Sequence, residues 1–309
     1  MNSYDLPAAG SVPPGSMISF PRPSKGGATQ HLVLTMLGDY WQQEASWLPS
    51  RLIIALGAHL GITASAASTA LSRLAGRGVL EQSSAGRSSR YRLTEAARVR
   101  LQIGFRQVSE FGSESRQWDG MWTVVGFSIP ESARETRELL RSRLKWLGFS
   151  PLYGALWVCP WDRTEAVDEA CAAYGVANYV VFRSRTSSLQ GREPIEAWAL
   201  DEMREQYHPF IETYSRSIPG SPDRALSPAE AFRLRTEIMD SWRAFPWNDP
   251  GLPRELLPAD FPLLTARKLF VSAYNSLADP ALEHVREVIR SEAPEAAGSP
   301  SALRVSEGA

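Results

Sequence analysis

The stretch Leu60–Thr94, "LGITASAASTALSRLAGRGVLEQSSAGRSSRYRLT", decides how the first third of this chain folds. Thr63 is a good helix-capping residue, and Gly76 and Gly78 end the helix that it predicts. Apolar residues recur along that helix at the spacing of one buried face: Ala67, Ala70, Leu71 and Leu74. The opposite face then points to solvent and carries small and polar residues: Ser65, Ala66, Ser68, Thr69, Ser72 and Arg73.

The segments around this helix complete a known order of elements. Apolar helices are predicted before it, in residues 28–39 and 47–61. Two short strands follow it, Val79–Glu81 and Arg90–Leu93, and the Ser- and Gly-rich turn "QSSAGRSS" joins them. Helix, helix, turn, helix and hairpin is the order of a winged helix-turn-helix domain, which we expect over residues 28–115.

Basic residues concentrate in the same part of the chain. From Arg51 to Arg106 there are nine Arg and only two acidic residues, Glu81 and Glu95. Residues 1–117 hold 12 Lys+Arg against 7 Asp+Glu, a balance of +5, whereas the remaining 192 residues hold 21 against 27, a balance of −6. Such an asymmetry favours a polyanionic partner for the basic part.

Double-stranded DNA is the polyanion that this pattern fits. Short hydroxyls and methyls let a helix approach base edges in the major groove, and Arg73 can reach guanine or a phosphate. The hairpin is placed to reach phosphates or the adjacent minor groove. Beyond the helix face, the predicted contacts are Arg77, Arg87, Ser88, Arg90 and Arg92. One alternative stays open, because winged helices also serve as scaffolds that bind proteins without specific DNA binding.

The pattern of predicted strands and helices is different in the rest of the chain. Residues 122–185 predict a β-α-β-α-β run, with one more strand hidden in "GFSPLYGALWV" as part of a hairpin, which is typical of a small ferredoxin-like domain. Helical patterns follow, one of them with Ser227 as cap and Pro228 in its first turn. The expected fold is therefore α+β and multidomain, with these parts: a disordered arm over 1–27, the winged helix-turn-helix over 28–115, the ferredoxin-like α/β domain over 118–192, a helical C-terminal domain over 193–292 and a disordered tail over 293–309.

Several function classes find no support in the sequence. Cys159 and Cys171 lie in apolar surroundings without a partner at zinc-ligand spacing, and the four His are scattered. No GxSxG, Walker A or GxGxxG motif stands between a strand and a helix. We therefore expect no enzyme, no metal and no cofactor. No stretch reaches the roughly 20 apolar residues of a membrane span, and no signal peptide is evident, so the cytoplasm is the expected location.

Longer stretches of the sequence resemble one known family. They are "TMLGDYW", "GITASAASTALSRLAGRGVL", "GRSSRYRLT", "WDGMWTVVGFSIPE", "LGFSPLYGALWVCP", "FRLRTEIMDSWRAFPWNDPGLPRELLP" and "ARKLFVSAY". In this order they resemble the PaaX-type transcriptional repressors of aromatic-acid catabolism, from about Ala28 to His284. The first two stretches are shared by many winged helices, whereas the last few are specific.

The resemblance implies the same three-part fold and a homodimer that binds palindromic operator DNA, as the repressor of an aromatic-compound catabolic operon. It also implies release by an aryl-acyl-coenzyme A thioester, phenylacetyl-CoA in the founding pathway. Because the sequence does not fix the acyl group, a free aromatic acid or another pathway metabolite stays open as the effector. The central domain resembles the small CRISPR-adaptation endonucleases, which hold a metal with an acidic residue after the first strand. Phe127 and Ser128 stand at that point in this chain, which argues against a nuclease.

Aromatic and cationic side chains alternate late in the chain, where an effector could bind. An aryl-CoA needs an apolar slot for its acyl group and cations for its phosphates. The predicted effector residues are Arg233, Arg235, Trp242, Arg243 and Trp247, with Arg183 and Arg185 at the end of a central strand as a second phosphate-binding option. Trp242 keeps two interpretations, because its spacing from Ile238 is also that of a core residue.

Overall fold

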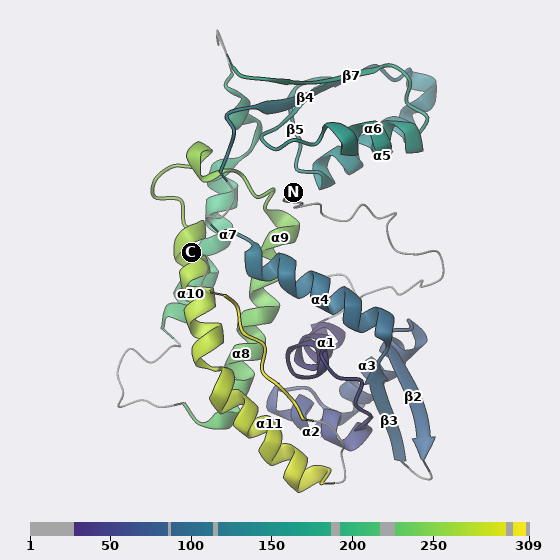
Figure 1. The fold of residues 1–309 in the computed structure, drawn as a ribbon, viewed down its shortest axis with the longest axis vertical. Helices are drawn as coiled ribbons and strands as arrows, with labels where there is room; N and C mark the ends of the chain where they lie inside the picture. Colours follow the sequence, from purple (N-terminus) through teal and green to yellow (C-terminus); the bar gives the residue numbers. More distant parts are fainter. Residues whose placement is uncertain are drawn as a thin grey trace.

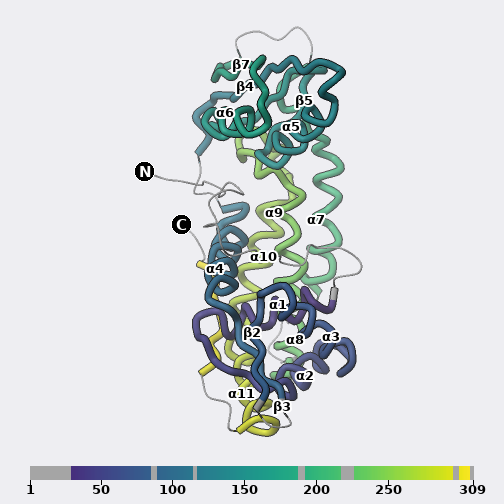
Figure 2. The backbone as a smooth tube through the Cα atoms, turned by 90° about the vertical axis from the view of Figure 1, so that its right-hand side faces the viewer, coloured from purple at the N-terminus to yellow at the C-terminus, as the bar shows by residue number. Residues whose placement is uncertain are grey.

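Helices and two small antiparallel sheets make up the protein, as a computed structural model shows (Figure 1). The structure describes residues 28–85, 88–113, 117–186, 192–216, 226–294 and 299–306. The arm predicted over residues 1–27 lies outside these ranges. Figure 1 places the four-stranded sheet and its helices at one end of the molecule, and Figure 2 shows a long, narrow outline from the side.

The N-terminal unit combines helices with a small sheet. Its elements are α1 (Ala28–Trp41), β1 (Leu48–Pro49), α2 (Ser50–His59), α3 (Ala64–Gly76), β2 (Leu80–Ala85), β3 (Ser88–Leu93) and α4 (Glu95–Glu110). The sheet order is β1-β3-β2, and both pairings are antiparallel. The predicted helices and hairpin are confirmed, but both strands are longer than predicted, because residues 82–85 and 88–89, expected in the turn, belong to β2 and β3. β1 was not predicted, because two residues, one of them Pro49, show no alternation that a pattern could reveal.

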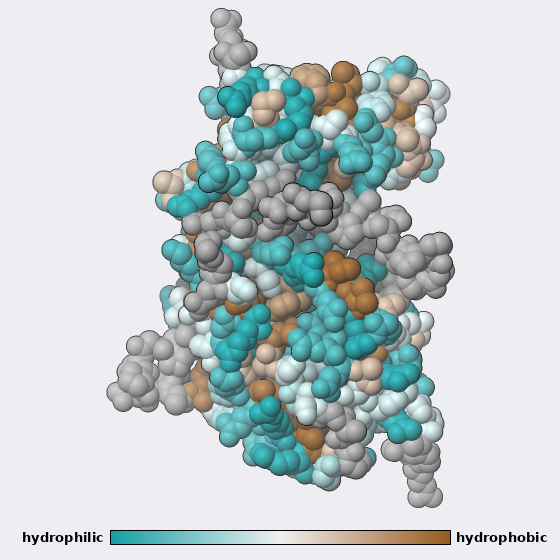
Figure 3. All heavy atoms as spheres, viewed as in Figure 1, coloured by the Kyte–Doolittle hydropathy of each residue, from teal (hydrophilic) through white to brown (hydrophobic). Residues whose placement is uncertain are grey.

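The central domain carries the second sheet. Its elements are β4 (Trp122–Phe127), η1 (Glu131–Ala133), α5 (Arg134–Trp146), β5 (Ser150–Tyr153), β6 (Leu156–Cys159), α6 (Thr164–Ala173) and β7 (Tyr179–Ser184). The strand order is β5-β6-β4-β7, all antiparallel, and β5 is the hidden strand of the predicted hairpin. α5 and α6 cover one sheet face over Val125 and Trp157. The other face leaves Val180 and Phe182 54% and 47% exposed, and Figure 3 shows apolar groups gathered at that end of the molecule.

The remaining elements are helical. They are η2 (Pro194–Ala197), α7 (Leu200–Ser215), α8 (Pro228–Trp242), α9 (Phe245–Asn248), η3 (Arg254–Leu256), α10 (Leu263–Ser276) and α11 (Ala278–Glu292). The cap predicted for α8 is present, since the Glu230 N–H donates to the Ser227 hydroxyl at 3.3 Å and the Glu230 carboxylate accepts from the Ser227 N–H at 2.8 Å. Pro228 occupies the first turn, as predicted.

One hydrophobic core joins the N-terminal unit to the C-terminal helices. Val33 and Leu37 of α1 belong to the same buried cluster as Phe232 of α8 and Val285 of α11. α8 packs against α1, and α11 packs against α8 and α2. The central domain instead has a core of its own. Chain regions that are far apart in sequence therefore form one packed body.

The disordered tail predicted over 293–309 is wrong for residues 299–306. Leu303 and Val305 are buried in this segment, and the Leu303 N–H donates to the Asp39 carbonyl of α1 at 3.3 Å. In Figure 1 the segment starts beside the N-terminal unit and runs alongside the C-terminal helices toward the end of the chain. The apolar side chains hold it there because they cover surface that would otherwise face water.

Candidate nucleic-acid interface

α3 is held by a cap at its start and by small residues on its inner side. The Thr63 hydroxyl accepts a hydrogen bond from the Ala66 N–H at 3.3 Å, which confirms the predicted cap. All four residues predicted to face inward are buried: Ala67, Ala70, Leu71 and Leu74. α3 packs against α1 and α2 with this face, so its outer face is presented by a rigid scaffold.

The outer face of α3 is polar and open to solvent. Nearly all residues predicted to lie on it are exposed, with Ala66 half-buried: Ser65, Ser68, Thr69, Ser72 and Arg73. The Ser68 hydroxyl donates to the Ala64 carbonyl at 2.8 Å, and the Thr69 hydroxyl donates to the Ser65 carbonyl at 2.9 Å. These bonds direct the hydroxyl lone pairs outward, so the two side chains present acceptors to a base edge in this conformation.

Two arginines at the end of α3 supply positive charge. Arg73 lies in the last turn, and Arg77 is the residue that follows the helix. Both are exposed, and neither side chain forms an ion pair with any residue that the structure describes. A cation without a protein partner is available to a phosphate or to guanine.

Arg90 and Arg92 of the hairpin have protein contacts that the sequence did not indicate. The Arg92 guanidinium lies 2.6 Å from the Glu81 carboxylate, and it also stacks over the Trp47 ring at 4.6 Å. Arg90 lies over the same ring at 5.4 Å and is exposed. The sequence does not reveal this role of Trp47, because nothing in a loop residue before β1 shows which strand it will cover. The Trp47 ring holds the guanidinium groups of Arg90 and Arg92 in place on the N-terminal unit, and Glu81 neutralises the charge of Arg92.

Two predicted hairpin contacts cannot be placed. Arg87 lies outside the described residues, and only the backbone of Ser88 is described, as the first residue of β3. Both stay predictions.

Arg235, a predicted effector residue, lies inside the shared core with no exposed surface. It donates to the Asp39 carboxylate at 3.3 Å, to the Tyr274 carbonyl at 3.2 Å and to the Leu303 carbonyl. The Tyr274 hydroxyl donates to the other Asp39 oxygen at 2.8 Å. Burial raises the pKa of Asp39 to about 6, against the opposing effect of Arg235 and the Tyr274 hydroxyl. Arg235 thus joins α1, α10 and the segment 299–306, and in this arrangement no ligand reaches it.

The other predicted effector residues of the C-terminal region differ in their exposure to solvent. Trp242 has no exposed surface and stacks on Phe270, which agrees with its interpretation as a core residue. Arg243 is half-buried, whereas Arg233 and Trp247 are exposed, Trp247 by 69%.

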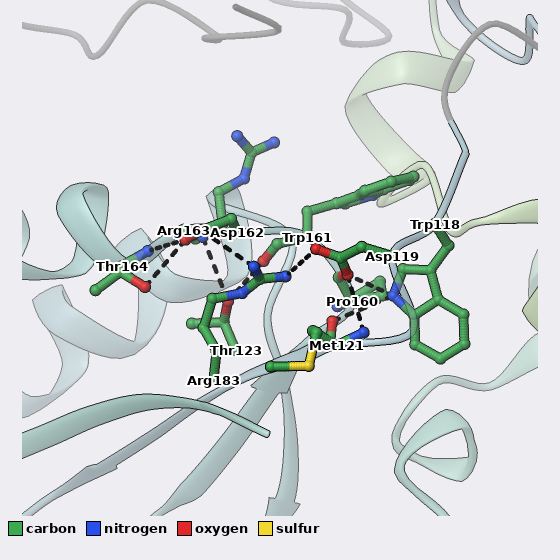
Figure 4. A network of polar contacts seen from close by, with 10 residues as sticks. All are labelled: Trp118, Asp119, Met121, Thr123, Pro160, Trp161, Asp162, Arg163, Thr164 and Arg183. Carbon is green, nitrogen blue, oxygen red and sulfur yellow. Dashed lines mark hydrogen bonds and ion pairs between the residues drawn. The ribbon is translucent and has the colours of Figure 1, made fainter. Parts of the chain in front are cut away.

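Arg183, the second phosphate-binding option, is held by two carboxylates. Figure 4 shows its guanidinium between Asp119 at 2.6 Å and Asp162 at 3.3 Å. Burial acts to raise the pKa of Asp119, but hydrogen bonds from Arg183 and the Met121 N–H lower it below its ordinary value. Arg183 therefore fastens the loops at the end of β7, and Arg185 stays exposed nearby.

Within the described parts of the chain, no three His, Cys, Asp or Glu side chains are grouped so that they could hold a metal ion. No helix in those parts is long and apolar enough to cross a membrane.

Comparisons with known proteins cover most of the chain. Three family models match it: "PaaX-like protein" over residues 28–97, "PaaX protein central Cas2-like domain" over 115–196 and "PaaX-like protein C-terminal domain" over 198–287. The transcriptional repressor PaaX of Escherichia coli (strain K12) is 30% identical over 268 residues, which are 83% of this chain and 82% of that protein. The chain belongs to the PaaX family. The resemblance seen in the sequence is thereby confirmed.

A solved structure shares the fold. An uncharacterized protein from Mycobacterium tuberculosis matches 84% of this chain with 98% of its own, at a TM-score of 0.56 and 23% identity. At that identity the likeness shows the fold alone. Within the PaaX-family matches, α3 and the hairpin lie in the first range, whereas the segment 299–306 lies beyond the last.

Proposed function

We propose that this chain is a sequence-specific transcriptional repressor that reads double-stranded operator DNA with α3. The observation that carries the proposal is the outer face of α3. It presents exposed hydroxyls, and Arg73 and Arg77 lie at its C-terminal end without an ion pair to any described residue. The name of the Escherichia coli relative, a transcriptional repressor, supports the same function. Such a face reads bases, and arginines beside it bind phosphates.

Two finer fold assignments belong to this proposal. Residues 28–110 follow the order of a winged helix-turn-helix, in which α3 is the recognition helix and β2–β3 the wing. The central domain follows the β-α-β-β-α-β order of a ferredoxin-like domain, and the strand order β5-β6-β4-β7 supports it.

We extend the proposal to a homodimer on a palindromic operator of aromatic-compound catabolic genes. Dimeric readers place two recognition helices about one helical turn of DNA apart, so operator symmetry mirrors protein symmetry. The proposed release signal is an aryl-CoA such as phenylacetyl-CoA, or a related aromatic metabolite. Membership of the PaaX family supports both extensions.

Selection of genomic fragments on the purified protein, followed by gel shifts, tests the proposal. We expect recovery of a palindromic site upstream of catabolic genes. Arg73→Ala should weaken binding to that site by about 1–3 kcal/mol and relax its specificity. Arg77→Ala should weaken binding to all sequences and flatten the salt dependence by about one unit. Arg106→Ala, at an exposed position on α4, is the matched control.

Random recovery of fragments would overturn the proposal and favour a winged helix that serves as a scaffold for protein partners. Equal binding by the Arg73→Ala and Arg106→Ala variants would exclude α3 as the reading surface.

A further inference from the structure

The outer face of the three-stranded sheet carries a pair of opposite charges. Strand pairing sets Glu81 of β2 directly opposite Arg92 of β3. The neighbouring pair, Leu80 and Leu93, is buried, so the alternation of side chains along the strands places Glu81 and Arg92 on the outer face. The Arg92 Nε donates to the Glu81 Oε2 at 2.7 Å, and the Arg92 Nη2 lies 2.6 Å from the same oxygen. Both side chains stay partly open to solvent, Arg92 by 35% and Glu81 by 43%.

Glu81 is the one acidic residue in a long basic stretch of the sequence. Residues 45–94 contain six Arg and no other Asp or Glu. Each cation beside a phosphate adds to the affinity for DNA, whereas a carboxylate in the same surface repels the backbone. Glu81 therefore lowers the positive charge of this stretch by one unit, and it lies on the guanidinium group of Arg92.

The indole ring of Trp47 holds the same guanidinium group from another side. Arg92 lies over this ring at 4.6 Å from its centroid, and Arg90 lies over it at 5.4 Å. Arg90 is exposed and forms no ion pair with any residue that the structure describes. Two guanidinium groups thus share one aromatic ring, and Glu81 neutralises the charge of Arg92 but not that of Arg90.

The hairpin lies where its charge would act on DNA bound at α3. α3 packs against β2, and Figure 1 shows β2 and β3 side by side at the edge of the N-terminal unit. Under the proposed function, DNA that enters α3's outer face runs past this hairpin, and contacts to its backbone position the protein. Charges within the screening length, about 8 Å at physiological salt, act on the phosphates. While Glu81 holds Arg92, the pair adds almost no net charge there.

An ion pair across two strands also has a purely structural interpretation. Opposite charges on facing strands stabilise a hairpin, but a pair this exposed does so weakly because solvent screens it. The two interpretations predict opposite changes in DNA affinity. If the pair serves only the hairpin, binding stays equal or weakens when Glu81 loses its charge. If the pair masks a cation, binding becomes stronger.

We propose that Glu81 lowers the affinity of this protein for DNA of any sequence by holding Arg92 away from the phosphate backbone. Trp47 is the positioning residue, because its ring keeps the guanidinium group in place and would present it to a phosphate once the carboxylate is gone. The inference rests on the proposed function and deepens it. α3 supplies the reading of bases, whereas the Glu81–Arg92 pair sets the strength of the sequence-independent part. Weaker sequence-independent binding reduces the time spent on competing sites.

Glu81→Gln tests the proposal, because it keeps the size of the side chain and removes its charge. Fluorescence anisotropy with the full chain measures binding to two duplexes of equal length, the selected genomic site and an unrelated sequence. We expect both to bind about five-fold more tightly at about 0.15 M salt, since one more phosphate is neutralised. The slope of log K against log salt should steepen by about 0.9. The preference for the selected site should stay unchanged.

Glu131→Gln is the matched control. Glu131 pairs with Arg137 of α5 at 2.8 Å, and Figure 1 places α5 at the opposite end of the molecule from β2 and β3. The substitution removes the same charge and releases an arginine in the same way, so affinity and salt slope should both stay unchanged. An equal gain for both variants would show that total charge alone is responsible, which overturns the role of the Glu81–Arg92 pair.

Two further variants separate Arg92 from the carboxylate. Arg92→Gln leaves Glu81 as an uncompensated negative charge and should weaken binding to both duplexes. Glu81→Gln combined with Arg92→Gln removes one charge of each sign and should bind like the unmodified protein. A double variant that keeps the gain of Glu81→Gln overturns the role of Arg92.

Trp47 is tested in the Glu81→Gln background. Trp47→Leu removes the aromatic face and should reduce the gain in affinity, whereas Trp47→Phe keeps a ring and should retain most of it. Equal gains with Leu and with Phe would overturn the positioning role, because side-chain bulk alone would then be enough.

Misfolding of the hairpin cannot imitate the expected result, since a damaged hairpin binds DNA more weakly. Unmodified protein that binds no DNA would refute the proposed function and this inference with it. Binding that depends on Arg73 but does not change with Glu81→Gln would refute the inference alone.

Discussion

The N-terminal unit and the central domain are joined to the C-terminal helices in different ways. The N-terminal unit shares a continuous hydrophobic core with α8, α10 and α11, and a buried ion pair crosses the boundary between Asp39 and Arg235. The central domain has a separate core. It meets the C-terminal region through a small cluster around Trp122 and through single hydrogen bonds, such as that from the Trp161 indole to the Gly251 carbonyl at 2.7 Å.

This difference indicates which parts move together. Cooperative units of a protein follow continuous buried contacts rather than sequence order. The N-terminal unit and the C-terminal helices should therefore unfold as one, and the central domain as another. The four predictions below test that division, from the largest expected effect to the smallest.

Loss of Arg235 should be the most damaging change. Arg235→Met leaves the Asp39 carboxylate buried without its cation, which should lower the free energy of unfolding by about 3–5 kcal/mol. Urea denaturation followed by circular dichroism measures it. Arg233→Met, at an exposed position of the same helix, should stay within about 0.5 kcal/mol of the unmodified protein. An equally small loss of unfolding free energy for Arg235→Met would contradict the claim that the Asp39–Arg235 pair stabilises the shared core.

The stability of the same body should depend on pH through Asp39. Its pKa is about 6 in the folded protein against an ordinary 3.8, so the folded state binds the proton more tightly. The resulting contribution is complete below about pH 4 and is lost as pH rises through 6, by about 3 kcal/mol in all. Denaturation between pH 4 and pH 7.5 should show this slope in the unmodified protein and not in Asp39→Asn. The same pH dependence of the free energy of unfolding in both proteins would rule out Asp39 as its source.

Removal of the segment from Ser299 onward should destabilise the shared body and spare the central domain. It exposes the surface under Leu303 and Val305 and removes the two hydrogen bonds between Val305 and the Asn275 side chain, at 2.7 and 2.9 Å. We expect a loss of about 2 kcal/mol, smaller than the apolar burial alone because the ordered segment regains entropy.

Scanning calorimetry separates the two bodies in that truncated chain. The full-length Leu303→Asp variant should show the same shift, since it removes the anchor without shortening the chain. A shift in the central-domain transition instead would break the proposed division.

A substitution at the contact between the central domain and the C-terminal region should have the smallest effect on stability. Trp161→Phe keeps the ring packing but loses the hydrogen bond to Gly251, at a cost of about 1 kcal/mol. Calorimetry should show the change only in the central-domain transition. Trp247→Phe, at an exposed position, should show none. An equal shift of both transitions under Trp161→Phe would mean that the chain unfolds as a single unit.

Local patterns predicted the elements and the face of α3 well. The cap at Thr63 and the 3.6-residue spacing of its buried residues depend only on neighbours in sequence, so the sequence contains them in full. The α8 cap at Ser227 is local in the same way. β1 is too short to leave a pattern, and it forms only because β3 offers it a free edge.

Contacts between distant residues could not be predicted. Asp39 and Arg235 are separated by 196 positions, and charged side chains are mostly exposed, so an arginine in an aromatic region suggested a ligand site. The same holds for the stacking of Arg90 and Arg92 on Trp47. The segment 299–306 was expected to be disordered because Ala, Gly, Ser and Pro dominate around it, and the alternation of Leu303 and Val305 is too short to outweigh that composition.

The buried pair of Asp39 and Arg235 also constrains how the chain is made. During synthesis α1 leaves the ribosome long before α8 exists, so Asp39 lacks its arginine and the side of α1 that packs against α8 stays uncovered for most of translation. The N-terminal unit cannot close its core until α8 and α11 have been added. A ribosome-bound chain that stops before residue 228 should leave the α8-facing side of α1 uncovered and be a substrate for chaperones, and the surface proposed to read DNA would mature only on the nearly finished protein.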